Sequence, residues 1–158
     1  MEITVCGLNE VIEHIDYVDC VISIVDPGCE FARPAELDEL NEWVLNLEFD
    51  DSWYGVESAG DVFCSDDNLQ AVTDFLDRCL KENKQNLLIH CFQGVSRSTA
   101  IAVVAYAYLG EPCPYRRVLK ENYQARPNPY ILELAEDFLG IELDMAENPN
   151  PYHLKLYV

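Results

Sequence analysis

The chain of 158 residues is poor in basic side chains: ten lysines and arginines stand against 29 aspartates and glutamates, which gives a formal net charge of −19. An acidic surface of this kind repels nucleic acid and anionic membranes at long range, so we expect neither as a partner. Long apolar runs are missing too, since the longest, Thr99 to Leu109, is too short to span a bilayer. The first residues lack the basic segment of a secretory signal. Together these absences favour a cytoplasmic protein.

Motifs that pair cysteines or bind metals are also absent. The seven cysteines are odd in number and include no Cys-x-x-Cys, which favours free thiols in a reducing compartment over a disulfide framework. No group of histidine, cysteine and aspartate has the spacing of metal ligands, and we expect neither a metal nor another cofactor. The length fits a single domain over residues 1–158, in which 140–158 form a tail without a recognisable pattern. The sequence indicates no particular oligomeric state.

The positive charge that the chain does have is concentrated in one segment. Residues 84–126 hold six basic and two acidic side chains, a net charge of +4. Residues 1–83 hold three basic and 21 acidic side chains, and residues 127–158 hold one and six. The pattern indicates a local cationic site in an acidic body, although an acidic surface can also serve solubility alone.

The positive segment contains the stretch His90-Cys91-Phe92-Gln93-Gly94-Val95-Ser96-Arg97-Ser98, which lies between an apolar run and an alanine-rich run. This layout predicts a strand, a tight loop and a helix. Backbone N–H groups in such a loop bind a tetrahedral anion, and the helix dipole favours thiolate over thiol at Cys91. The planar fork of Arg97 can grip two phosphoryl oxygens, and Gly94 allows a positive φ in the turn. The alternative is an inert buried cysteine followed by a surface arginine.

The nine residues resemble the Cys-x5-Arg signature of the protein tyrosine phosphatase superfamily. The resemblance extends over Tyr17 to Leu139, because Arg126-Pro127-Asn128-Pro129-Tyr130 is similar to a segment of compact dual-specificity phosphatases and of a small prokaryotic group of predicted tyrosine phosphatases. It implies a cysteine phosphatase fold and a cysteinyl-phosphate intermediate on Cys91. It further implies that Phe92, Gln93, Gly94, Val95, Ser96 and Arg97 bind the phosphate, that His90 braces the loop, that Ser98 stabilises the leaving thiolate, and that Asn128 hydrogen-bonds toward the loop.

A phosphatase of this kind needs a general acid from elsewhere in the chain. Asp51 is the preferred candidate, because it follows an alternating strand pattern and resembles the strand-then-aspartate segment of compact dual-specificity phosphatases. Its separation of 40 residues from the cysteine (91 minus 51) is longer than in that group, so residues 54–64 would be an insertion. Asp61 is the second candidate and Asp50 the third. Asp66 and Asp67 are expected in the first turn of a helix.

Strand and helix patterns alternate along the chain, which predicts an α/β fold with a mainly parallel central sheet flanked by helices. Whatever the strand order, the carboxyl ends of the strands 44–51 and 87–90 can lie side by side, as the mechanism needs if Asp51 is to reach the loop. The expected strands cover 3–5, 17–25, 44–51 and 87–90, and the expected helices cover 8–14, 34–41, 66–82, 98–109, 114–124 and 130–139.

The sequence leads to three hypotheses of different classes. The first is a cysteine-dependent phosphatase acting on phosphotyrosine in proteins or peptides, and by extension on phosphoserine or phosphothreonine. The second is a phosphate-binding module with the same loop but without turnover. The third is thiol chemistry, with Cys64 or Cys113 as the resolving thiol. The loop interior holds no lysine, and by the resemblance this argues against a phosphoinositide substrate.

Overall fold

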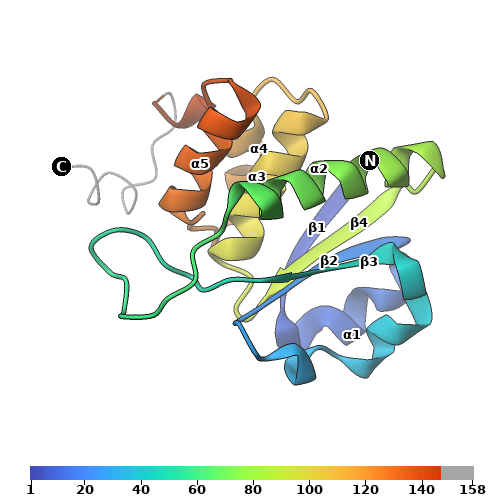
Figure 1. The fold of residues 1–158 in the computed structure, drawn as a ribbon. Coiled ribbons are helices and arrows are strands. Elements are labelled where there is room, and N and C mark those ends of the chain that lie inside the picture. The colour runs from blue at the N-terminus through green and yellow to red at the C-terminus, as the bar shows by residue number, and fades with distance from the viewer. Residues whose placement is uncertain (147–158) are drawn as a thin grey trace.

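A computed structural model describes residues 1–146, so the expected tail lies partly outside the described residues, and the single domain over 1–158 stays a prediction. Four strands form one parallel sheet in the order β1–β4–β2–β3 (Figure 1). The strands are β1 (Glu2–Gly7), β2 (Cys20–Val25), β3 (Val44–Glu48) and β4 (Asn86–Cys91). The α/β prediction is confirmed, and all described strand pairs are parallel.

Helices cover both faces of the sheet (Figure 1). One face carries α2 (Asp66–Lys81), α3 (Arg97–Tyr108), α4 (Pro114–Glu121) and α5 (Pro129–Leu139). The other carries α1 (Val11–His14) and the 3₁₀ helix Ala35–Trp43, and further 3₁₀ helices cover Leu8–Glu10, Ile15–Tyr17, Glu30–Ala32 and Asp144–Ala146. No helix within residues 1–146 is both long and apolar enough to cross a bilayer.

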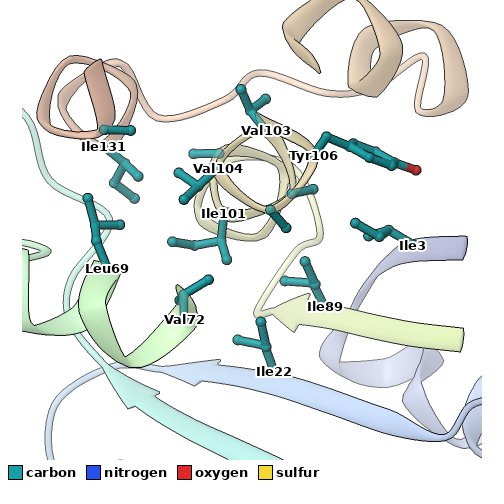
Figure 2. Packing of buried hydrophobic residues seen from close by; sticks show 14 of the residues in the cluster. Ile3, Ile22, Leu69, Val72, Ile89, Ile101, Val103, Val104, Tyr106 and Ile131 are labelled. Carbon is teal, nitrogen blue, oxygen red and sulfur yellow. The ribbon is translucent and has the colours of Figure 1, made fainter. Parts of the chain in front are cut away.

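The main core lies between the sheet and the larger helical layer, with α3 at its centre. Figure 2 shows side chains of α2, α5 and three strands around this helix. Because successive strand residues face opposite sides, Ile22 and Ile89 point into this core, whereas Val21 and Leu88 belong to the smaller cluster on the opposite face. This burial on both faces explains why β2 and β4 read as continuous apolar runs.

Three expectations about the elements are corrected. The expected helix 34–41 is the 3₁₀ helix Ala35–Trp43, whose ladder is broken by Asn41 at φ 50°. The expected strand 17–25 begins only at Cys20, because the chain before it turns in the 3₁₀ helix Ile15–Tyr17. The strand from Val44 ends at Glu48, although the N–H of Phe49 still donates to the carbonyl of Val25 at 3.3 Å.

The sequence leaves the strand order open, and the structure decides it. The strands β3 and β4 are not neighbours, since β2 pairs with both and lies between them. The carboxyl end of β2 therefore stands next to the loop that follows β4. This places Asp26, which directly follows β2, at the edge of the sheet where the candidate phosphate loop (residues 91–97) begins.

Candidate active site

The loop between β4 and α3 is held against the end of β1. The N–H of Leu8 donates to the carbonyl of Phe92 at 3.0 Å. Gly94 has a φ of 74°, as expected, and a Cβ at this position would lie 2.5 Å from the backbone carbon of Cys6. Both the conformation and the close approach of two backbones therefore require glycine at position 94.

The thiol of Cys91 lies inside the loop, and its side chain is buried. Its Sγ lies 3.2 Å from the backbone N–H of Gly94, which donates to it, and 3.1 Å from Oγ of Ser98. Together with the N-terminus of α3, these groups surround the sulfur with polar hydrogen-bonding partners and partial positive charge. Burial raises the pKa of the Cys6 and Cys64 thiols to about 12.

Arg97 is the first residue of α3 and is only 6% exposed. Hydrogen bonds hold one edge of its guanidinium group in place. Its Nη1 donates to Oδ1 of Asp26 at 2.6 Å and to the carbonyl of Phe49 at 2.9 Å. Among the described residues, Nε and Nη2 of Arg97 have no hydrogen-bond partner. The opposite edge of the guanidinium is thus available to an oxyanion in the bidentate manner typical of arginine.

Sequence analysis missed Asp26 as a site residue, because Asp-Pro-Gly after a strand indicates a turn. The turn is present, and the N–H of Cys29 donates to the carbonyl of Asp26 at 3.0 Å. The pairing of its carboxylate with Arg97 depends on β2 lying beside β4, and no local pattern in the sequence shows that order.

The three candidate acids have different surroundings. Oδ1 of Asp51 accepts a hydrogen bond from Oγ of Ser96, within the loop, at 2.7 Å, and another from Nδ2 of Asn128 at 2.9 Å. Asp50 instead accepts the N–H of Val62 at 2.7 Å, which closes the base of the segment 51–61. Of the two, only Asp51 therefore contacts the phosphate loop.

Asp61 is bound within its own segment. It accepts hydrogen bonds from the hydroxyl of Ser52 and from the N–H of Ser58, and these bonds lower its pKa. Both donors belong to the segment 51–61, so neither bond brings Asp61 to the loop that holds Cys91.

Asn128 joins the loop, the segment 51–61 and α5. Its side chain is fully buried, and its Oδ1 caps α5 by accepting the N–H of Ile131 at 3.1 Å. Its backbone N–H donates to the carbonyl of Ser96 at 3.1 Å, and its Nδ2 also donates to the carbonyl of Ser52 at 3.3 Å. The expected hydrogen bond of Asn128 toward the loop is present.

No family model and no curated protein matches the chain. Solved structures do match over most of its length. They include Cydia pomonella PTP-2 phosphatase (21% identity, TM-score 0.63, 87% of this chain and 85% of that chain) and Tk-PTP (16% identity, TM-score 0.62, 86% and 88%). A third is the human tyrosine phosphatase-like serine/threonine/tyrosine-interacting protein (14% identity, TM-score 0.63, 87% and 91%). The chain has the protein tyrosine phosphatase fold.

A cavity of about 150 Å³ adjoins Cys91. It is lined by Cys91 and Arg97 and by apolar side chains that include Phe31 and Phe92. Both aromatic rings are largely exposed, at 83% and 65%. The cavity also contains Cys29, whereas the two cysteines considered as resolving thiols, Cys64 and Cys113, do not line it.

The other residues of the loop are more exposed than Cys91, and backbone contacts tie the loop to its neighbours. Gln93 is exposed, and Val95 and Ser96 are half-buried. The carbonyl of Val95 accepts the N–H of Arg126 at 2.8 Å and Oγ1 of Thr99 at 2.6 Å, which ties the loop to α3 and to the segment before α5. Within residues 1–146, no three His, Cys, Asp or Glu side chains form a group that could hold a metal ion.

Proposed function

We propose that this protein is a cysteine-dependent phosphatase that hydrolyses phosphotyrosine in proteins or peptides. The observation that carries the proposal is the arrangement around Cys91. Its sulfur contacts the N–H of Gly94 in the loop and the hydroxyl of Ser98 at the start of α3, and Asp51 is hydrogen-bonded to Ser96 of the same loop. A nucleophile, an anion site and a carboxyl group thus converge at one point, as a phosphomonoester hydrolase requires.

The reaction then has two steps. In the first, the Cys91 thiolate attacks phosphorus, the bond from phosphorus to the ester oxygen breaks, and Asp51 donates its proton to the leaving oxygen. In the second, a water molecule gives a proton to Asp51 and attacks the cysteinyl-phosphate, and the thiolate leaves with inorganic phosphate as the product. Arg97 and the loop N–H groups hold the phosphoryl oxygens throughout, and Ser98 stabilises the departing thiolate by its hydrogen bond.

The lining of the cavity supports an aryl ester. Phe31 and Phe92 present exposed aromatic rings beside Cys91, where they can pack on the ring of a phosphotyrosine. A phosphoserine or phosphothreonine offers no ring for this contact, so we expect slower turnover of those substrates by the same site.

The decisive experiment compares wild type with Cys91→Ser, Asp51→Asn and Asp61→Asn on p-nitrophenyl phosphate and on a phosphotyrosine peptide. Loss of the general acid typically costs on the order of 10² to 10⁴-fold and removes the basic limb of the pH profile. We expect this for Asp51→Asn, whereas Asp61→Asn retains its profile. The proposal fails if Cys91→Ser turns over either substrate as fast as wild type.

The second candidate is a phosphoprotein-binding module without turnover. This function is supported by the ion pair between Arg97 and Asp26. A phosphate that binds to Arg97 comes close to the carboxylate of Asp26, and the two negative charges repel each other. A wild type that binds a phosphotyrosine peptide but hydrolyses neither substrate would favour this function over the enzyme.

A further inference from the structure

A chain of polar side chains runs through the core behind the phosphate loop. Nδ1 of His90 lies 3.2 Å from the carbonyl oxygen of Cys91, and Nε2 of the same ring lies 2.7 Å from Oγ of Ser23. Nε of Arg33 donates to that Oγ at 3.2 Å. Ser23 and His90 are fully buried and face each other across the pair β2 and β4. This series of hydrogen bonds thus connects Arg33, beyond the end of β2, with Cys91, the first residue of the loop.

The chemistry of the groups allows one arrangement of protons. A carbonyl oxygen only accepts, so Nδ1 of His90 must carry the proton that binds Cys91. Burial lowers the pKa of His90 to about 4, and the charges of Arg33 and Arg97 act in the same direction, so the ring is neutral near pH 7. Nε2 is then an acceptor. The hydroxyl of Ser23 donates to it and accepts from Arg33.

Arg33 is itself fixed in place. Its Nη2 donates to the carbonyl of Leu47 at 3.1 Å, and its Nη1 lies 3.7 Å from a carboxylate oxygen of Glu48. The side chain is 12% exposed. The guanidinium therefore presents Nε toward Ser23 with little freedom to turn away.

We propose that Ser23 and Arg33 are positioning residues of the phosphate loop. They hold His90 in the tautomer protonated at Nδ1, and this N–H fixes the peptide group of Cys91. The fixed peptide in turn keeps the sulfur within reach of the N–H of Gly94 and the hydroxyl of Ser98. The link to turnover rests on the proposed phosphatase function, whereas the effect on the tautomer and on the thiolate does not.

Four variants test the proposal. Ser23→Ala removes the hydroxyl that joins Arg33 to His90, and Ser23→Thr keeps it. Arg33→Gln removes the charged donor at the far end. The matched control is Arg78→Gln, because Arg78 also donates to a backbone carbonyl, that of Glu42 at 2.9 Å, but has no connection to the loop. Thermal melts of all four show whether each variant is folded.

Two readouts are independent of turnover. The first is the ¹⁵N chemical shifts of the His90 ring, which report the tautomer. The second is the rate of iodoacetamide alkylation at Cys91 against pH, followed by peptide mass spectrometry. We expect Ser23→Ala and Arg33→Gln to shift the alkylation profile of Cys91 to higher pH and to lower kcat/KM about tenfold, which is the effect of losing one hydrogen bond of ordinary strength. Ser23→Thr and Arg78→Gln should retain the wild-type profile.

The proposal is overturned if wild-type His90 is protonated at Nε2, a result that needs no variant. It is also overturned if Arg33→Gln or a folded Ser23→Ala leaves the alkylation profile unchanged. If wild type hydrolyses no phosphate ester but the tautomer and the alkylation profile respond as expected, the phosphatase function fails and the positioning role stands.

Discussion

Two glycines with positive φ make different demands on their surroundings. Gly94 in the phosphate loop has a φ of 74° and Gly110 after α3 has a φ of 90°. A Cβ at Gly110 would meet no atom within 4 Å, whereas a Cβ at Gly94 would lie 2.5 Å from the backbone of Cys6. The pair therefore separates the cost of the backbone conformation from the cost of a steric clash.

We predict that Gly110→Ala destabilises the protein by about 1–2 kcal/mol, the usual penalty of a left-handed conformation, and leaves turnover unchanged. Gly94→Ala should destabilise more and should lower kcat/KM by roughly 10²-fold, because the clash displaces the loop from Cys91. Urea denaturation and assays on p-nitrophenyl phosphate measure both effects. Equal losses of activity in the two variants would contradict the role of the close contact.

The buried ring of His90 makes stability depend on pH. Burial lowers its pKa to about 4, whereas the unfolded value is near 6.5. The unfolded chain therefore takes up a proton first as the pH falls. The contribution of His90 to stability is full above pH 6.5 and is lost as the pH falls toward 4.

We predict that the free energy of unfolding decreases by on the order of 2–3 kcal/mol between pH 7 and 4.5 through this group. In His90→Asn this part of the slope should be missing, while the contribution of the carboxylates is common to both proteins. Urea denaturation at a series of pH values provides the comparison. Parallel slopes in the two proteins would show that His90 titrates normally in the fold.

At the scale of elements, Asn128 joins the segment 51–61 to the start of α5. Asn128 caps α5 with its oxygen and holds Asp51 and Ser52 with its nitrogen. The rings of Tyr54, Phe63 and Tyr130 add an aromatic cluster at the same place, with centroids 4.8–5.5 Å apart. The segment that carries the candidate acids is thus fastened to the start of a helix.

We predict that Asn128→Asp separates the two roles of this side chain. Aspartate is as good an N-cap as asparagine, so the cap should remain. The two amide donors are lost, however, and a second carboxylate then faces Asp51, so kcat should fall tenfold or more while KM changes little. Asn128→Ala, which loses the cap as well, should also be about 1 kcal/mol less stable. An unchanged kcat in Asn128→Asp would contradict the positioning of Asp51 by this residue.

At the scale of the whole molecule, charge should select among substrates. The net charge is −19, and the exposed Asp26 lies at the phosphate loop, where it pairs with Arg97. An acidic surface slows the approach of acidic ligands and speeds that of basic ones, and salt screens both effects.

We predict that a phosphotyrosine peptide flanked by lysines has a kcat/KM about tenfold higher at low salt than the same peptide flanked by aspartates. As the ionic strength rises, kcat/KM should fall for the lysine-flanked peptide and rise for the aspartate-flanked peptide, so that the difference between them becomes smaller. A peptide with neutral flanks is the control. A common salt response for all three peptides would show that the acidic body does not influence substrate choice.

Much of the fold could be predicted because it depends on local patterns. The helix expected over 66–82 is α2 at Asp66–Lys81, and Ser65 caps it by accepting the N–H of Asn68 at 3.2 Å. The strand, loop and helix around Cys91 follow from one short segment, and so does the need for glycine at position 94. Asp51 was preferred on strand position, and the structure brings it to Ser96.

Other features depend on how distant segments pack. The apolar patterns do not show which strands are neighbours, because buried parallel strands look alike in sequence. Once β2 lies between β3 and β4, Asp26 meets Arg97, and Ser23 faces His90.

By itself the sequence determined the loop between Cys91 and Arg97 and the α/β class, because both depend on residues that are close together in the chain. Only the tertiary structure decided which carboxylate reaches the loop and which serves the segment 51–61, and only it joined Arg33 to the loop. Those contacts join residues that are 10 to 77 positions apart in the chain, and they form only once the strands have paired in their final order.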